Sequence, residues 1–322
     1  MTSYWIMLFA LGLTVKGYSQ ADLLNQIVLN EVEQLGKLSS LRFVVEDDVR
    51  TISDFEGIKT GATQKATFSY WSQIGDRRDL TNLFKKKLKL MDEKVGIVVD
   101  HVIVYDQSTF SALDNRSGRM SVDIKVPGPY DLLRNRAGVF LPLRFIAFLS
   151  NGKPFEEDGF IFSLNRLSEY KITDFLKNSQ VIPLSSNDKL VKQYWPDQTC
   201  FFVRKIPPLN ETQVVTSFYV VAVSEQKKMI LGWTYFENDS PIESLLIKNR
   251  VKLFNKNKES VELMSDAGML HYYQGSLVSK STVIVSDIIL DEVYLEETFQ
   301  LDPSTANSIY DRQTRELIRV PK

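Results

Sequence analysis

The clearest pattern near the start of the chain lies at residues 22–38, where apolar side chains recur at the spacing of an α-helix. The positions between them are mostly polar, so the segment has one apolar and one polar face. The apolar stripe consists of Leu24, Ile27, Val28, Val32 and Leu35. This pattern predicts one amphipathic helix that packs its apolar face on the rest of the protein.

The segments that follow alternate between apolar and polar positions, which is typical of β-strands. The first alternation carries Leu41, Phe43 and Val45. Further strands are predicted over residues 66–72, 77–90, 95–105, 109–113 and 120–126, with turns at residues 75–76 and 115–118. Successive strands joined in this way predict an antiparallel meander.

The pattern changes at residues 127–129, where Pro-Gly-Pro ends the last of these strands. Residues 130–135 and 139–149 then have a helical pattern, in which Arg144 is the only charged residue of the second segment. A helix that is apolar on nearly every side must be buried, and this one is too short to span a membrane. We therefore predict that it plugs or covers the sheet. A second, partly helical stretch is predicted over residues 155–177.

Strand periodicity resumes after a polar loop at residues 185–188. The predicted strands span residues 200–205, 214–223, 228–236, 245–254, 260–264, 269–277 and 282–294. About six strands before the helical interruption and about seven after it exceed the number in a small sandwich. The expected fold is mainly β: a large, curved antiparallel sheet, or incomplete β-barrel, closed by an N-terminal helix and inserted helices. No low-complexity linker or fixed repeat divides residues 20–322, so we expect a single domain.

Residues 1–19 have the pattern of a signal peptide. An apolar run at residues 4–15 is followed by Gly17 and Ser19, small residues at the two positions that a signal peptidase reads. An uncleaved membrane anchor is the alternative, but it needs roughly 20 apolar residues and Lys16 interrupts the run before that length. We therefore predict a signal peptide over residues 1–19, no transmembrane segment in the mature chain, and a periplasmic or secreted protein.

Charge and cysteine content narrow the partners and the compartment. The chain has 39 Lys and Arg against 40 Asp and Glu, so no overall field attracts nucleic acid, and none is expected as a partner. The only cysteine, Cys200, cannot form an internal disulfide, which suits a bacterial periplasm. Because Cys200 is followed by Phe201 and Phe202, we expect it to be a small buried hydrophobic residue rather than a nucleophile.

The sequence contains none of the common catalytic or cofactor-binding motifs. The two histidines, His101 and His271, lie in separate predicted strands, without the spacing of a metal site. No motif for nucleophilic, phosphoryl-transfer or dinucleotide chemistry is present, so we predict no cofactor and no enzyme activity. Paired carboxylates remain as an alternative, because a glycosidase needs only two acids flanking the scissile bond. The candidates are Glu156, Glu157 and Asp158, or Asp47 with Asp48.

A resemblance adds to this interpretation. The amphipathic helix at the mature N-terminus, the run Thr67-Phe68-Ser69-Tyr70-Trp71, the basic pair Arg77-Arg78 and the apolar helices inserted in mid-sheet together resemble the LolA/LolB-like superfamily of outer-membrane lipoprotein carriers. Its members fold as an incomplete β-barrel closed by helices around an apolar cavity, and they carry acyl chains through the periplasm or sense lipids. This chain is much longer than a standard carrier. Its tail, residues 299–322, is also similar to the ends of uncharacterised secreted bacterial proteins.

The resemblance implies a carrier or sensor that buries a lipid, an acyl chain or a similar apolar ligand, with a protein of the cell envelope as a further partner. The predicted apolar lining comprises Phe140, Leu143, Arg144, Phe145 and Phe148. Arg144 must find a carboxylate, backbone carbonyls or a ligand head group, since a buried unpaired guanidinium is costly. Two alternatives stay open: a structural or interaction module whose barrel is filled by its own side chains, and a carboxylate-dependent hydrolase.

Overall fold

The computed structural model describes most of the chain between residues 22 and 320. The described ranges are residues 22–54, 60–73, 83–94, 96–106, 110–124, 138–145, 179–206, 217–311 and 313–320. The predicted signal peptide, the pair Arg77-Arg78 and the second helical stretch, residues 155–177, lie outside them. The first described element is a helix over residues 22–36, as the apolar stripe predicts.

The first half of the sheet is the predicted meander. Its strands are β1 (Ser40–Thr51), β2 (Thr63–Gln73), β3 (Leu83–Asp92), β4 (Gly96–Asp106), β5 (Phe110–Asp114) and β6 (Arg119–Ile124). Each strand pairs antiparallel with the next one along the chain. The turn at residues 115–118 lies where the sequence places it.

The second half is also a meander, with differences from the predicted strands. Its strands are β7 (Ser179–Leu184), β8 (Thr199–Lys205), β9 (Ser217–Ser224), β10 (Met229–Glu237), β11 (Ser240–Phe254), β12 (Ser260–Tyr273) and β13 (Ser276–Leu290). The separate strands predicted over residues 260–264 and 269–277 are wrong, because β12 continues through Ser265 and Asp266 with a β-bulge in its pairing to β11. The short helix α6 (Lys189–Tyr194) and strand β7 have no counterpart among the predictions.

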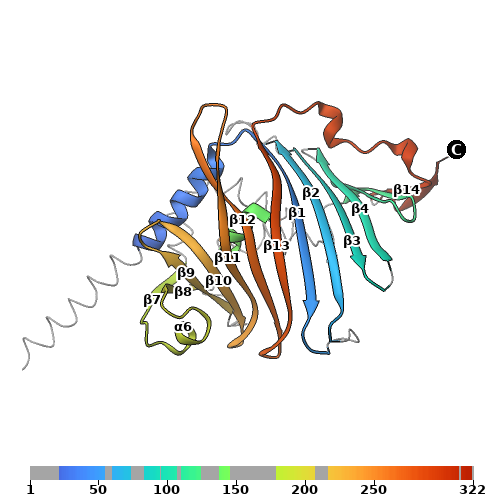
Figure 1. Cartoon of the computed structure of the whole chain (residues 1–322). Coiled ribbons are helices and arrows are strands. Elements are labelled where there is room, and N and C mark those ends of the chain that lie inside the picture. The colour runs from blue at the N-terminus through green and yellow to red at the C-terminus, as the bar shows by residue number, and fades with distance from the viewer. Residues whose placement is uncertain are drawn as a thin grey trace, which may run out of the picture.

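All these strands join into one 15-stranded sheet that does not close. β1 pairs with β13, which joins the two meanders side by side. The tail adds β14 (Ser308–Asp311), which pairs parallel with β6, and then β15 (Glu316–Arg319), so β15 and β7 are the two edges. Figure 1 shows the strands as a strongly curved wall. The prediction of a mainly β, open and curved sheet is therefore confirmed.

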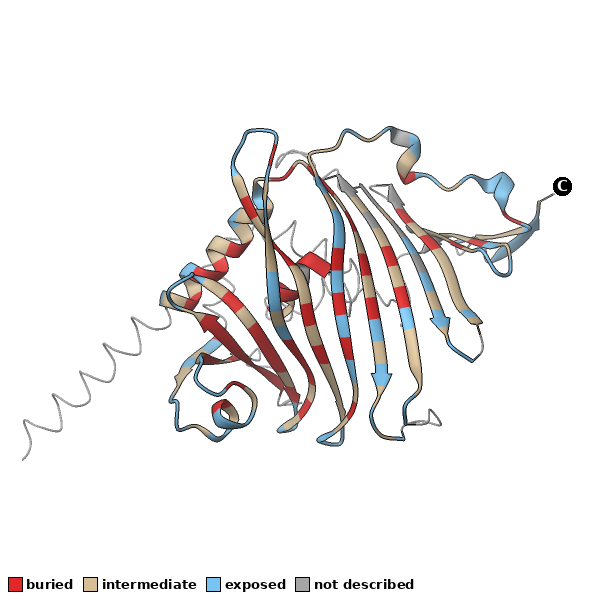
Figure 2. Cartoon of the chain, in the orientation of Figure 1, coloured by how far each residue is buried: buried red, intermediate tan, exposed pale blue. Residues whose placement is uncertain are grey.

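The two faces of the sheet have different roles. We call the face that carries Phe43, Trp233 and Met269 the inner face, and the opposite face the outer face. The inner face holds the main hydrophobic core together with the helix at residues 22–36, whose Leu24, Ile27 and Val28 are fully buried. Figure 2 shows the resulting alternation of buried and exposed residues along the strands.

The outer face has a smaller core beneath α6. Val191 and Trp195 of that segment pack on side chains of β8, β9 and β10, which are Cys200, Phe202, Phe218, Val220, Ala222 and Phe236. Phe218 and Phe236 stack with ring centroids 4.7 Å apart. α6 therefore covers one end of the outer face.

A buried ion pair fixes the N-terminal helix on the inner face. Arg250 of β11 donates to both oxygens of Glu31, over 3.0 and 2.6 Å, and the two side chains are 7% and 8% exposed. Glu31 also accepts the backbone N–H of Ile230 at 3.0 Å, and Arg250 donates to the carbonyl of the same residue. Both charged side chains are therefore hydrogen-bonded, the carboxylate to donors and the guanidinium to acceptors. A shift of the helix along the sheet would leave a buried charge unpaired, so these contacts fix its register.

None of the helices among the described residues is long and apolar enough to cross a membrane.

We expect Arg250→Leu or Glu31→Leu to lower the free energy of unfolding by about 3–5 kcal/mol, since each leaves one buried charge unpaired. The double variant should recover part of that loss, because it leaves no charge behind. Urea denaturation of the three variants measures these differences. A double variant as unstable as the sum of the singles would show that the two groups do not act as a pair.

Candidate ligand site on the inner face

The inserted apolar segment is described over residues 138–145, which form a 3₁₀ turn against the inner face and then the first two residues of an α-helix. This turn, η1 (Gly138–Leu143), contains Pro142, which has no backbone N–H to donate to an α-helical ladder. The segment was expected to be helical and buried, and its described apolar side chains are buried. The exposed fractions of Val139, Leu141, Leu143 and Phe145 are 5%, 1%, 2% and 0%.

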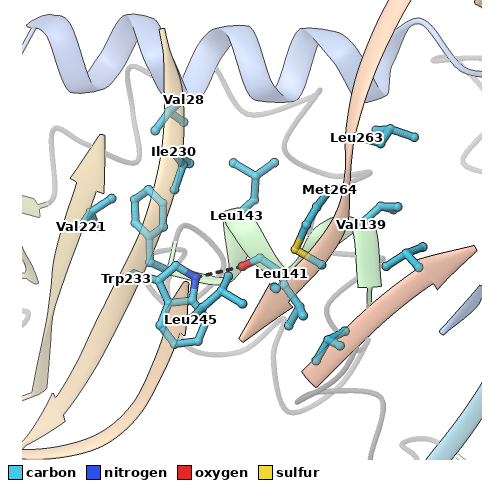
Figure 3. Close-up of a cluster of buried hydrophobic side chains, with 14 of the residues drawn as sticks. Val28, Val139, Leu141, Leu143, Val221, Ile230, Trp233, Leu245, Leu263 and Met264 are labelled. Atoms are coloured by element: carbon cyan, nitrogen blue, oxygen red, sulfur yellow. Dashed lines mark hydrogen bonds between the residues drawn. The ribbon is translucent and has the colours of Figure 1, made fainter. Parts of the chain in front are cut away.

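Gly138 lets this turn approach the sheet closely. Its φ is +53°, and an added Cβ would lie 2.8 Å from the ring of Phe43 and from a methyl group of Val45. A larger residue would therefore both strain the backbone and collide with β1. On the other side of the turn, the indole Nε1 of the fully buried Trp233 donates to the carbonyl of Leu141 at 2.9 Å (Figure 3).

Arg144 directly after the turn is paired within the protein. Its guanidinium donates to Glu243 of β11, and the side chains are 16% and 6% exposed. Burial alone lowers the pKa of Arg144, but the charge of Glu243 and the hydrogen bond to it outweigh that effect and hold the pKa above its usual value. The guanidinium also lies 5.5 Å from the ring centre of Trp233. Of the partners expected for Arg144, the structure supplies the carboxylate.

A histidine completes this polar cluster. Glu243 and His271 are directly opposite each other on β11 and β12, and Nδ1 of the histidine lies 3.6 Å from Oε1 of the glutamate. Arg144, Glu243 and His271 thus form a short row of ionisable groups within an apolar face. We call these three residues the polar cluster.

Aromatic rings surround the polar cluster. Tyr219 contacts Phe145, Trp233 and Tyr235, with centroid distances of 6.2, 5.5 and 4.8 Å. Burial raises the pKa of Tyr219 and of Tyr235, and the hydroxyl of Tyr235 donates to Glu237 at 2.6 Å. Both phenols therefore remain neutral donors at physiological pH. An apolar surface with a few convergent polar groups is the usual character of a small-molecule site.

The structure brings together three of the five predicted lining residues. Leu143, Arg144 and Phe145 lie side by side on the inner face. Phe140 belongs to η1, but its side chain is outside the described part, and Phe148 lies outside the described residues. Glu243, Trp233 and Tyr219 also lie at this site and were not predicted from the sequence. The signal for Glu243 was an acidic residue in a mostly apolar run, residues 241–246.

The other candidate groups do not converge. Asp47 and Asp48 are consecutive on β1 and point to opposite faces, since Asp47 is buried and Asp48 is exposed. Glu156, Glu157 and Asp158 lie outside the described residues. His101 lies on β4, where its Nε2 is 3.7 Å from Oδ1 of Asp114 on β5. Within the described ranges, no group of three or more His, Cys, Asp or Glu could hold a metal ion.

Cys200 is the small buried residue that the sequence predicts. Burial, with a smaller effect of Asp188, raises the pKa of its thiol to about 12.

Comparisons with known proteins add a likeness of layout. The fold is similar to that of a DUF1329 family protein from Desulfovibrio piger, with a TM-score of 0.46 and 8% identity over 87% of this chain and 97% of that chain. It is also similar to a LolA superfamily protein from Nitrosomonas europaea, with a TM-score of 0.39 and 8% identity over 85% and 97% of the chains. No family model and no curated protein matches the sequence.

We expect Glu243→Leu to cost about 3–5 kcal/mol of folding free energy, because it leaves Arg144 buried without its carboxylate. Glu243→Gln should cost less, since the amide oxygen still accepts a hydrogen bond. Chemical denaturation compares the two variants. Equal losses would indicate that the shape of the side chain, rather than its acceptor oxygens, holds Arg144.

We expect the Cys200 thiol to react with a thiol-labelling reagent at about pH 8 at least about 100-fold more slowly in the folded protein than in the urea-unfolded chain, because the thiolate is the reactive form. Absorbance of the released thiolate chromophore measures both rates. Rapid labelling of the folded protein would contradict the burial of Cys200.

Proposed function

We propose that the protein is an exported, non-enzymatic binder of a lipid or other apolar ligand, acting as a carrier or sensor in the periplasm. The ligand's apolar part would lie on the inner face of the sheet beside Leu143 and Phe145. Its polar end would meet Arg144, in competition with Glu243. The predicted signal peptide at residues 1–19 supports export.

The observation that carries this proposal is the combination of an open sheet with one continuous apolar inner face. The sheet ends at β15 and β7 without closing, while side chains of β1, β2 and β8 to β13 contribute to one core on that face. Removing apolar area from water contributes about 25 cal/mol per Å², so an acyl chain gains affinity there without specific polar contacts. The polar cluster then offers the few oriented groups that select a head group.

A second candidate is a structural module whose half-barrel is filled by its own side chains. The complete burial of Phe145 and the near-complete burial of Leu141 and Leu143 favour it, because the described part of the inserted segment already occupies the inner face. In the binding proposal, the ligand shares this face with the segment or displaces it. The two functions therefore differ in whether added lipid enters the core.

Native mass spectrometry with lipid extraction, on mature protein purified from a periplasm, separates the two. A co-purified lipid of defined mass, or uptake of an added fatty acid, supports a carrier or sensor. A single ligand-free mass that persists after addition of fatty acids supports the self-filled module and rejects the binder.

We expect Phe145→Ala to lower the uptake of a fluorescent fatty acid at least about 10-fold, because it removes part of the apolar lining. Phe236→Ala on the outer face is the matched control, since both rings are almost fully buried and either truncation costs about 3–5 kcal/mol. Titration of the two variants under conditions where both remain folded gives the comparison. Equal loss of uptake in both would contradict a site on the inner face.

A further inference from the structure

The outer face contains a hollow that the inner-face site does not use. It has a volume of about 830 Å³ and lies between α6 and the strands β11, β12, β13 and β1. This size falls within the roughly 300–1,000 Å³ of typical small-molecule pockets. We call it the outer pocket.

Two glycines in one row of the sheet explain its shape. Leu246 of β11 has Gly232 of β10 on one side and Gly268 of β12 on the other. A Cβ on Gly232 would lie 2.3 Å from the ring of Trp195, so this indole fills the space above the first glycine. A Cβ on Gly268 would meet only Cε of Lys248, at 3.6 Å, so the space above the second glycine is open. The outer pocket is therefore deepest above Gly268, where the sheet has no side chain to fill the space.

The wall beside α6 is held in place by hydrogen bonds. The indole Nε1 of Trp195 donates to Oγ1 of Thr234 at 3.0 Å, and the hydroxyl of Ser244 lies 3.0 Å from the same atom. All three residues are buried. The pocket is thus bounded on this side by fixed side chains and is formed before any ligand arrives.

One half of the outer pocket is apolar and aromatic. Tyr194 and Tyr272 meet edge to face at 6.3 Å, and Leu246, Leu270 and Leu277 also line the pocket. Leu246 is 50% exposed although it lies in the middle of the sheet. Burial raises the pKa of both tyrosines, so their hydroxyls stay protonated. This half offers apolar area and ring edges to a ligand.

The other half is cationic. Arg50 of β1 and Lys280 of β13 are directly opposite each other in the ladder, an arrangement of like charges that weakens a sheet. Among the described residues, neither side chain has an ion pair. Asp48 is the one carboxylate among the described residues of the lining. Lys248 also lines the pocket, and its Nζ lies 3.9 Å from Oδ1 of Asp266, which is not part of the lining. The described lining holds three cations, Arg50, Lys248 and Lys280, against the carboxylate of Asp48, so its net charge is positive.

We propose that the outer pocket binds an organic anion with an apolar or aromatic body. The anionic group would lie between Arg50 and Lys280, where it relieves the repulsion between them. The body would cover Leu246 and the ring of Tyr272, above Gly268. This inference does not depend on lipid binding at the inner face, because the two sites lie on opposite faces of the sheet.

Fluorescence titration with anilinonaphthalene sulfonate, an aromatic anion, tests the pocket on the mature full-length protein. Gly268→Leu fills the floor, and its backbone requires no positive φ, so the variant should fold and bind the probe at least about 10-fold more weakly. Arg50→Gln with Lys280→Gln should weaken binding to a similar extent and also raise the urea midpoint, because it removes the like-charge pair. Lys94→Gln with Lys227→Gln, two exposed turn residues, removes the same charge elsewhere and should leave affinity unchanged.

A second probe tests the charge requirement. Phenylnaphthylamine, which has a similar ring system without the sulfonate, should bind the wild-type pocket at least about 10-fold more weakly, and added salt should narrow this difference. Unchanged affinity in both pocket variants would overturn the site, and equal affinity for the two probes would overturn the anionic requirement. Fatty acid uptake should persist in Gly268→Leu, so that failure at the inner face and failure at the outer pocket are distinguished.

Discussion

An open sheet of this size must bury its apolar inner face, and every other feature of the molecule depends on that requirement. A closed barrel satisfies it by curling on itself, whereas this sheet ends at two edges. The helix at residues 22–36 and the turn η1 supply the missing cover from outside the sheet. Hydrophobic burial provides the main stabilisation, because most of the core residues on this face are fully enclosed.

Burial alone does not determine where the covering elements sit, since apolar contact has no direction. Each of them is positioned by a polar contact inside the apolar surface. Glu31 and Arg250 position the helix, while the Trp233–Leu141 hydrogen bond and the Arg144–Glu243 pair position the inserted segment. Such contacts are expensive to leave unpaired, so they favour one register over its neighbours. The polar cluster thus holds the inserted segment in place, and in the proposed function the same groups would select the head group of a ligand.

Local pattern in the sequence predicted most of the described helices and strands but not which of them contact one another. The helix at residues 22–36 and the strands of the first meander could be predicted, because their apolar spacing reflects the faces they bury. The break predicted inside β12 was wrong because the strand bulges at Ser265 and does not end there: Asp266 pairs with Asn249 and Met264 with Arg250, which leaves Ser265 as the extra residue. β14 was missed because a four-residue strand carries too short a pattern to be distinguished from a loop.

The candidate sites show the same difference: single residues could be identified from local pattern, but their contacts with distant segments could not. Arg144 could be identified as a residue in need of a partner, because it is the one charge in an apolar run. Its partner Glu243 lies 99 residues away and is selected by the position of η1 on the sheet, which no local pattern encodes. The outer pocket is still less visible in sequence, since it arises from the register that aligns Gly268 and Gly232 on either side of Leu246.

The two faces of the sheet differ in how their cationic side chains are stabilised. On the inner face, each described cation within the core has a carboxylate against it, as expected where water is excluded and an unpaired charge is costly. On the outer face, water screens the repulsion between Arg50 and Lys280, so the sheet can tolerate like charges side by side. Tolerance alone does not explain why the adjacent row has an open glycine floor beside a fixed aromatic wall. The open space above Gly268 and the opposed cations Arg50 and Lys280 belong to the same hollow, and it is this combination of apolar and cationic surface in one place that favours a role in binding.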